Sequence, residues 1–388
     1  MASIAIIGAG LMGRLVALKL VQTQRQNTKH AKTVLKVCLF DKDAKTGCLS
    51  AASAAAGLLT PLGESWCCEN WIVEMGFDAL ALWPSILTQL ELPVFFQRQG
   101  TVAVAHAEDS GDMHRFKRHL KVNWPQYDGH NLDSAALQQL EPQLKRFNGG
   151  LYLPSEGQID NRQLLVALRH QLTLAEAQGC FEWHCQQSVS AVKARSVEVN
   201  GELRPFDLVI DCRGVGAATQ IADLRGVRGE LFRLYAPEVK LTRPVRLMHP
   251  RYQLYIAPKP DHHYVIGATE IESNDNGPMT VRSALELLSA AYSVHSGFAE
   301  ASIVEHISQC RPAFDNNHPQ IRVADGLIQV NGLYRHGFLL APVVLEHLIK
   351  VIERLGEAFS LQADGNKDNT LAQLSEGLDY PQLIQRVI

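Results

Sequence analysis

The stretch IAIIGAGLMG, residues 4–13, decides the fold of this chain. Its first four residues are apolar and predict a short buried strand, and the apolar residues that follow the stretch fit a helix. Gly8 allows a tight turn, Gly10 lets the backbone approach a pyrophosphate, and Gly13 lets the helix pack on the strand. The helix N-terminus then faces the anion. The stretch therefore predicts the dinucleotide-binding end of a doubly wound α/β fold.

A second strand, VLKVCLFD at residues 34–41, ends on Asp41. An acid at this position of a dinucleotide site binds the ribose, usually about 20 residues beyond the first glycine. Asp41 lies 33 residues beyond Gly8, and the polar segment 22–33, expected to be a helix end and a surface loop, accounts for the excess. We expect Asp41 to bind the ribose, with Lys42 beside it.

The segment LSAASAAAGLLTP, residues 49–61, consists largely of small residues. Such residues let the backbone approach a flat cofactor closely, with Ser53, Ala56 and Gly57 as the expected contacts. The composition fits an alanine-rich packed helix equally well, so the sequence leaves both interpretations open.

Composition excludes several classes of protein. The chain has 388 residues, 46% of them hydrophobic and 20% charged, as in soluble globular proteins, and its net charge of −3 gives no electrostatic case for a nucleic-acid partner. It has no apolar run of roughly 18 residues and no pattern typical of a signal peptide, so we expect no integral membrane association and a cytoplasmic location. Eight cysteines and fifteen histidines show no metal-ligand spacing, and we expect no metal.

The remaining chain alternates between two patterns. Residues 160–179 predict a helix with Asp160 as N-cap and Gly179 past its end, followed by a strand pair at 181–185 and 189–197. Antiparallel strands are expected over 227–271, with a hairpin turning at Pro260 and Asp261, and an amphipathic helix over 280–295. The βαβ pattern returns near residue 327, before a helix expected to begin at Pro342.

These patterns predict an α/β fold with an inserted β domain. A doubly wound, Rossmann-like domain, formed by residues 1–85, 156–222 and 311–388, is expected to be interrupted by an antiparallel-sheet substrate domain, formed by residues 86–155 and 223–310. The last segment would carry a C-terminal helix and tail.

The chain resembles the D-amino-acid oxidase superfamily of FAD-dependent amine oxidoreductases, and within it most the glycine oxidases that supply the imine for thiamine thiazole synthesis. The resemblance covers almost the whole chain and rests on eight segments in the family's order: IIGAGLMG, SAAAGLL, QIDNRQLLVALR, DCRGVGA, RGVRGEL, YIAPKPDHHYVIGATEIES, CRPAFDNNHP and GLYRHGFLLAP. It implies an FAD-dependent oxidase that converts glycine or another small amine to its imine by hydride transfer to flavin N5, with O2 reoxidising the flavin and releasing H2O2.

The resemblance also implies where FAD binds. The local pattern around Cys310 does not match the covalent flavin site of some sarcosine oxidases, so we expect non-covalent FAD. The expected cofactor contacts are Gly8, Gly10, Leu11, Met12, Gly13, Asp41, Lys42, Ser53, Ala56, Gly57, Val189, Gly214, His336, Gly337, Phe338 and Leu339. Backbone donors near Gly337 and the N-terminus of the following helix would face flavin N1 and O2, with positive charge added by Arg335 and His336.

Four residues are expected at the amino-acid end of the site. Arg311 matches the family's carboxylate-binding arginine, and a planar guanidinium binds a carboxylate in a bidentate manner. Tyr255 matches the active-site tyrosine whose hydroxyl reaches the same carboxylate, and Arg335 is the next candidate anchor. Glu270 stands where the family pattern has an apolar residue; an acid there either faces a basic group of a larger amine or points to solvent. We expect no general base, because orientation and an electron-poor flavin suffice.

Other functions remain open at this point. A dehydrogenase of D-amino acids, proline or sarcosine would pass electrons to another acceptor, and a non-catalytic FAD-binding protein would not need both Arg311 and Tyr255. A tRNA-modifying oxidoreductase would need a basic surface, which the net charge does not suggest. The apolar residues of 374–388 pack on their own domain or on a second copy, so a homo-oligomer also remains open.

Overall fold

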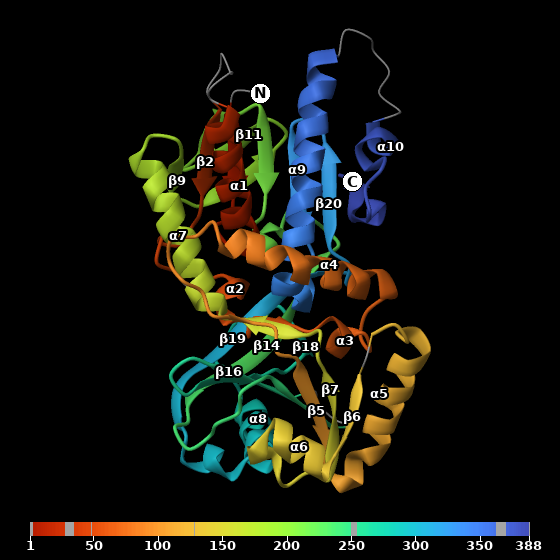
Figure 1. Cartoon of the computed structure of the whole chain (residues 1–388). Helices are drawn as coiled ribbons and strands as arrows, with labels where there is room; N and C mark the ends of the chain where they lie inside the picture. The colour runs from red at the N-terminus through yellow and green to blue at the C-terminus, as the bar shows by residue number, and fades with distance from the viewer. Residues whose placement is uncertain are drawn as a thin grey trace.

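The computed structural model describes residues 3–27, 35–47, 49–127, 129–249, 254–361 and 370–387. Cys48 and residues 28–33 of the expected surface loop lie outside this part of the chain. Two bodies share one chain, one built on a mostly parallel sheet and the other on a mostly antiparallel sheet, with helix α4 (Asn70–Leu87) between them (Figure 1).

The first body is a doubly wound seven-stranded sheet. Strand β1 pairs in parallel with β2 at one edge and with β13 at its other edge. The chain therefore continues from β1 to a neighbouring strand on one side and later returns to the opposite side of β1. In sheet order the strands are β22 (Ile384–Arg386), β20 (Gln320–Ala324), β21 (Leu327–Asn331), β13 (Leu208–Asp211), β1 (Ser3–Ile7), β2 (Lys36–Phe40) and β9 (Glu182–His184). The switch point between β1 and β13, where such folds bind ligands, is thus formed by Gly8 and the turn after Asp211.

The second body is a nine-stranded sheet. Its long strand β14 pairs with β17, β18 and β19, all antiparallel. In sheet order the strands are β18 (Ile271–Glu272), β14 (Leu224–Tyr235), β17 (His263–Gly267), β16 (Leu254–Lys259), β15 (Val245–Met248), β5 (Thr101–Ala105), β7 (Gly149–Leu153) and β6 (His130–Asp133), with β19 (Ser302–Phe314) on β14. The hairpin at Pro260 and Asp261 is confirmed, since β16 and β17 pair there.

Two small sheets and the helices complete the chain. The small sheets are β10–β11–β12 (Val189–Lys193, Ser196–Val199, Glu202–Pro205) and β3–β8–β4 (Leu58–Leu59, Gly157–Ile159, Phe96–Gln97). The helices are α1 (Leu11–Asn27), α2 (Ala51–Ala54), α3 (Pro61–Glu64), α5 (Ser110–Asn123), α6 (Ser134–Leu140), α7 (Asn161–Ala177), α8 (Val281–Val294), α9 (Gly337–Leu361) and α10 (Thr370–Ser375). Short 3-10 turns include η3 (Gly214–Ala217) and η5 (Tyr334–His336).

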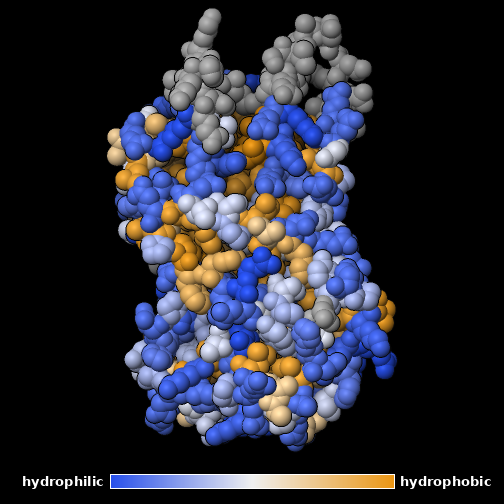
Figure 2. Space-filling view, viewed as in Figure 1, coloured by the Kyte–Doolittle hydropathy of each residue, from blue (hydrophilic) through white to orange (hydrophobic). Residues whose placement is uncertain are grey.

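Each large sheet has its own apolar core. Side chains of α1, α4, α7 and α9 pack on the seven-stranded sheet, while those of α6 and α8 pack on the nine-stranded sheet. On the face shown in Figure 2, hydrophilic side chains predominate on both bodies, with apolar patches at the level where they meet. The segment boundaries expected from the sequence remain a prediction. No helix of the described residues is long and apolar enough to cross a membrane.

Helix starts follow the local rules in two cases. Asp160 caps α7, accepting hydrogen bonds from the amides of Arg162 and Gln163 at 2.9 Å each. Thr280 caps α8 through the amide of Ser283. Both helices were expected from the sequence, and both are confirmed.

The start of α9 corrects the sequence prediction. The helix begins at Gly337, so Pro342 lies in its second turn and not in its first. A proline there removes the hydrogen bond to the carbonyl four residues earlier. That carbonyl belongs to Phe338, and the buried indole of Trp83 donates to it at 3.0 Å. A side chain from α4 therefore satisfies the group that Pro342 leaves without its helical partner.

The expected strand pair at 181–185 and 189–197 is also wrong in its pairing. Strand β9 pairs in parallel with β2, and β10 pairs with β11. The chain between them turns at Gln186, which has a positive φ of 55°, so the two strands join different sheets.

Candidate active site

A cavity of about 1280 Å³ lies where the two bodies meet. It runs from the loops after β1, β2 and β13 to the nine-stranded sheet. Most of the residues expected at the site line it: Gly8, Gly10, Leu11, Met12, Asp41, Lys42, Ala56, Gly57, Gly214, Tyr255, Glu270, Arg311, Arg335, His336, Gly337, Phe338 and Leu339. Segments from Gly8 near the start of the chain to Leu339 near its end thus share one cavity.

The three glycines of the first turn differ in what surrounds them. Gly8 has a φ of +97°, a conformation that L side chains rarely adopt. A Cβ on Gly13 would lie 1.8 Å from the carbonyl oxygen of Gly8, so helix and strand meet too closely for any side chain. A Cβ on Gly10 would meet only the Cβ of Ser50, at 3.8 Å, and would point into free space at the cavity wall. This arrangement fits a pyrophosphate held at Gly10.

Asp41 follows β2 and contacts the glycine turn. Its carboxylate accepts hydrogen bonds from the amides of Ala9 and, at 2.7 Å, Asp43. Arg14, which the sequence did not single out, fixes the same turn from the other side. Its guanidinium donates to the carbonyls of Ala9 at 2.8 Å and Leu165 at 2.7 Å, and burial lowers its pKa to about 10.

Three expected cofactor contacts lie outside the cavity lining. Gly13 packs against Gly8, and the Ser53 hydroxyl donates to the carbonyl of Ser50 at 2.8 Å. Val189 lies half-buried at the start of β10. The contact of these three residues with the cofactor remains a prediction.

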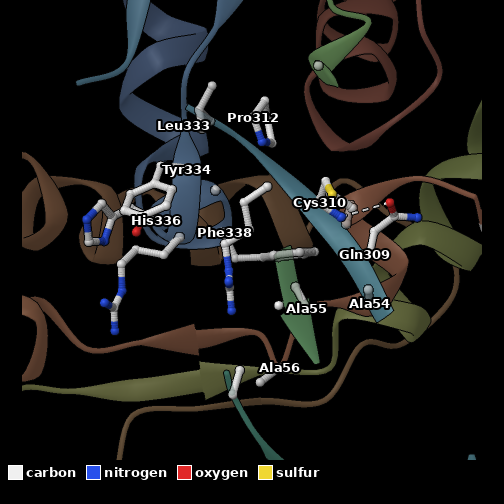
Figure 3. A pocket seen from close by; sticks show the side chains of 18 of the residues that line it. Ala54, Ala55, Ala56, Gln309, Cys310, Pro312, Leu333, Tyr334, His336 and Phe338 are labelled. Atoms are coloured by element: carbon white, nitrogen blue, oxygen red, sulfur yellow. Dashed lines mark hydrogen bonds between the residues drawn. The ribbon is translucent and has the colours of Figure 1, made fainter. Parts of the chain in front are cut away.

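The alanine-rich segment combines both interpretations that its sequence allows. Residues 51–54 form the short helix α2, and Ala54 at its end lines the cavity together with the following Ala55 and Ala56 (Figure 3). The side chain of Asn161, at the start of α7, donates to the carbonyls of Ala52 and Ser53 and fixes this helix. Small side chains therefore face the cavity from a packed element.

The turn before α9 contributes the opposite wall. Tyr334, His336 and Phe338 lie together at the cavity in Figure 3, on the η5 turn and the first turn of α9. Gly337 has no heavy atom within 4 Å of its added Cβ position, so the start of the helix borders free space. The amides of a helix N-terminus favour a partial negative charge on a ligand.

The expected positive charge of His336 is not present at neutral pH. The side chain is buried, and burial lowers its pKa to about 4 in spite of the nearby Glu64 carboxylate. Its Nδ1 lies 3.7 Å from Glu64 Oε2. His336 is therefore a neutral wall residue, and arginines supply the positive charge in this part of the cavity.

Arg311 lies on β19 with its guanidinium over Gly229 of the neighbouring strand. A Cβ on Gly229 would lie 2.4 Å from the guanidinium, so the missing side chain makes room for it. Its Nη1 donates to the carbonyl of Thr269 at 3.2 Å. Within the described residues, Arg311 forms no ion pair with a carboxylate, and its charge is free to bind a ligand.

Tyr255 lies on β16 in the same wall. Burial raises the pKa of its hydroxyl, although the charge of Arg311 opposes the shift. A Cβ on Gly267 would lie 2.8 Å from this hydroxyl, so a second glycine makes room for a side chain of the site. The phenol is a neutral hydrogen-bonding group near the guanidinium.

Sequence reasoning missed an acidic centre in this wall. Glu64 ends α3 and forms ion pairs with Arg335 at 2.7 Å and with Arg246 at 3.0 Å. Burial alone would raise the pKa of the Glu64 carboxyl, but the two arginines outweigh burial and hold it at about 2. Arg335 also pairs with Glu270 at 2.8 Å, so Glu270 faces a cation of its own chain.

Cys310 lines the cavity beside Arg311. Its thiol contacts the carbonyls of Ser273 and Asp275 at 3.4 and 3.6 Å, and burial raises its pKa. Its amide donates to the side chain of Gln309 at 3.0 Å (Figure 3). A protonated thiol directed at backbone carbonyls is poorly suited to form a bond to a cofactor.

The doubly wound sheet carries a glycine turn at its switch point and faces a second sheet across one cavity. This arrangement is typical of a dinucleotide-dependent oxidoreductase. Residues 3–350 match the family model DAO, FAD dependent oxidoreductase. The chain therefore belongs to this family of FAD-dependent oxidoreductases and is an enzyme of that family.

Three relatives illustrate the similarity. The chain is 36% identical over 342 residues, 88% of this chain and 93% of the other, to a Rhizobium etli protein provisionally named thiamine biosynthesis oxidoreductase ThiO. It is 25% identical over 386 residues, 92% of this chain and 94% of the other, to a glycine oxidase of Geobacillus kaustophilus. The crystal structure of glycine oxidase from that organism superimposes with a TM-score of 0.77 at 22% identity, covering 91% of this chain and 95% of the other. The α/β fold expected from the sequence is confirmed.

Proposed function

We propose that this protein oxidises glycine or another small amino acid to its imine, with non-covalently bound FAD as cofactor. The observation that carries the proposal is the guanidinium of Arg311, which lines the cavity beside Tyr255 without an ion-pair partner among the described residues. An amino-acid carboxylate matches a planar guanidinium in charge and in bidentate geometry.

The residues of the chain bind and orient the substrate. Arg311 would accept the carboxylate, and the hydroxyl of Tyr255 would donate a further hydrogen bond to it. A substrate held at these two groups would lie in the cavity that Gly337 and Phe338 also line. Holding the reacting carbon in one orientation is the largest contribution that binding residues make to such a reaction.

FAD, when bound, would supply the acceptor for the two electrons that leave the substrate's Cα–H bond as a hydride. Gly8, Gly10 and Asp41 would hold its pyrophosphate and ribose, and the start of α9 would border the pyrimidine end of the ring. The amino acid reacts in its neutral amine form, so we assign no general base. The thiol of Cys310 contacts carbonyls, which supports a flavin that is released when the protein is denatured.

We propose O2 as the electron acceptor that completes the cycle. The amino acid loses two electrons and two protons to become the imine, and O2 gains them to become H2O2. The Rhizobium etli relative carries a thiamine biosynthesis name, which supports the proposal that the imine serves thiazole formation.

The test is flavin reduction by a panel of amines. The purified yellow protein is mixed without oxygen with glycine, sarcosine, D-alanine and proline, and the loss of absorbance near 450 nm is followed. Air is then admitted and H2O2 is measured. Reduction by glycine followed by stoichiometric H2O2 supports the proposal. Reduction without reoxidation in air would instead assign a dehydrogenase, and no reduction by any amine would overturn the substrate class.

A further inference from the structure

Two arginines of the cavity wall differ in how their charge is balanced. Arg335 forms ion pairs with Glu64 at 2.7 Å and with Glu270 at 2.8 Å. Arg311 donates to the carbonyl of Thr269, and forms no ion pair within the described part of the chain. Arg335 therefore has two carboxylate partners, while Arg311 keeps its positive charge for a ligand.

Both carboxylate oxygens of Glu270 contact side chains of the turn before α9. One oxygen faces Arg335, and the other accepts a hydrogen bond of 2.6 Å from the hydroxyl of Tyr334. Tyr334 has a φ of +51°, an uncommon conformation for a residue with a side chain. Glu270 comes from the segment between β17 and β18, so it fixes this turn from the opposite body.

The group of charged side chains formed by Glu64, Glu270 and the arginines near them leaves room for one anion. Arg311, Arg335 and Arg246 contribute three positive charges, against two negative charges from Glu64 and Glu270. One net positive charge remains. It lies at Arg311, because the other two guanidiniums face carboxylates.

We propose that Glu270 determines specificity by occupying Arg335, so that the site accepts amino acids with one carboxylate and rejects those with two. This inference rests on the proposed function, since it takes Arg311 as the anchor of the first carboxylate. A second carboxylate that approached Arg335 would meet the negative charge of Glu270, which is 50% exposed on the cavity wall. Without that acid, Arg335 keeps its ion pair with Glu64, but Glu64 also pairs with Arg246. A second net positive charge would then be present in the same cavity, with Arg335 as the group that binds a second anion.

The experiment compares two unreactive ligands that differ by one carboxylate, acetate and malonate. Their dissociation constants are measured with the FAD-loaded protein from the perturbation of the flavin absorption spectrum, so no turnover is needed. We expect the parent to bind malonate no better than acetate. In Glu270→Gln, which keeps the size and removes the charge, we expect the preference for malonate over acetate to rise about tenfold or more, the effect of one gained charge-assisted contact.

Three further variants make the result specific. Glu272→Gln removes a carboxylate two residues away that pairs with Arg225 outside the cavity lining, and it should leave the ratio unchanged. Glu270→Gln combined with Arg335→Gln should lose the gain, because the second anion site is then absent. Glu270→Met provides a second charge-free side chain if the glutamine variant does not fold.

The outcomes separate the inference from the proposed function. If acetate binds the parent and neither charge-free variant gains affinity for malonate, the inference is overturned while the function stands. If neither ligand perturbs the parent spectrum, Arg311 is no carboxylate site, and both fail. A gain of iminodiacetate oxidation relative to glycine oxidation in Glu270→Gln would support the inference at the level of turnover.

Discussion

The guanidinium of Arg311 and the backbone carbonyl of Thr269 are joined by a hydrogen bond of 3.2 Å that links β19 to the segment after β17. This bond holds one nitrogen of the guanidinium and leaves the remaining donors for a ligand. The guanidinium lies over Gly229, where no side chain competes for the space. The proposed carboxylate site thus depends on planar geometry as well as charge.

Arg311→Lys should weaken substrate binding and slow flavin reduction. Lysine keeps the charge and loses the two-pronged geometry, and the loss of one charge-assisted contact costs about 1.5–3 kcal/mol, roughly ten- to a hundredfold in kcat/KM. The resting flavin spectrum should not change. Arg115→Lys, on the exposed surface of α5, is the matched control. Equal kinetics in both variants would make Arg311 a structural residue.

Gly10→Leu should abolish FAD retention without unfolding the protein. The added side chain meets only Ser50 and extends into the space assigned to the pyrophosphate. The flavin content after purification and the far-UV circular dichroism spectrum give the two readouts. Gly111→Leu, at an exposed helical glycine with no atom within 4 Å, should remain yellow. A yellow Gly10→Leu protein would remove this glycine from the cofactor site.

Trp83→Phe should destabilise the start of α9. The substitution removes the donor to the Phe338 carbonyl, which Pro342 leaves without a helical partner. An unsatisfied buried carbonyl costs about 1–3 kcal/mol, which urea denaturation would measure. Trp71→Phe removes an indole that bonds to the exposed carboxylate of Glu69 and should cost less than about 0.5 kcal/mol. Similar losses in the two variants would contradict the assigned contact.

His336→Gln should flatten the dependence of stability on pH between about 4 and 6.5. The folded pKa of about 4 lies below the ordinary value of 6.5, so in this range the unfolded chain binds a proton that the folded chain does not. The stability contribution is therefore present above pH 6.5 and is lost as pH falls toward 4. The slope of the unfolding free energy against pH should decrease by up to about 1.4 kcal/mol per pH unit, the value that corresponds to one proton. An unchanged slope would show that His336 is already protonated when folded.

Local rules account for the parts of the site that the sequence predicted. The glycine turn and the cap of α7 at Asp160 depend on neighbours in the chain. Asp41 follows from the order of strands in a dinucleotide site, and it contacts the glycine turn as that order predicts. Only the resemblance of their segments to a family predicts that Arg311, Tyr255 and Glu270 lie in one cavity. The roles of all these residues in catalysis remain predictions.

Distant contacts account for the features that the sequence did not predict. Glu64 stands in a short helix with no local signal, and its partners Arg246 and Arg335 come from β15 and from the turn before α9. The charge state of His336 depends on burial that no local pattern reveals. The start of α9 was misplaced because the rule for proline considers only its own helix, whereas the compensating donor, Trp83, lies 255 residues from Phe338.

The most direct test of the central claim, that Arg311 binds the substrate through its carboxylate, needs no variant. The oxygen-free protein is mixed with glycine and, separately, with glycine methyl ester, which keeps the amine and the Cα–H bonds and lacks the negative charge. The rate of loss of flavin absorbance is measured against the concentration of neutral amine. We predict that glycine reduces the flavin at least tenfold more efficiently than the ester. Equal efficiency for the two compounds would contradict the account.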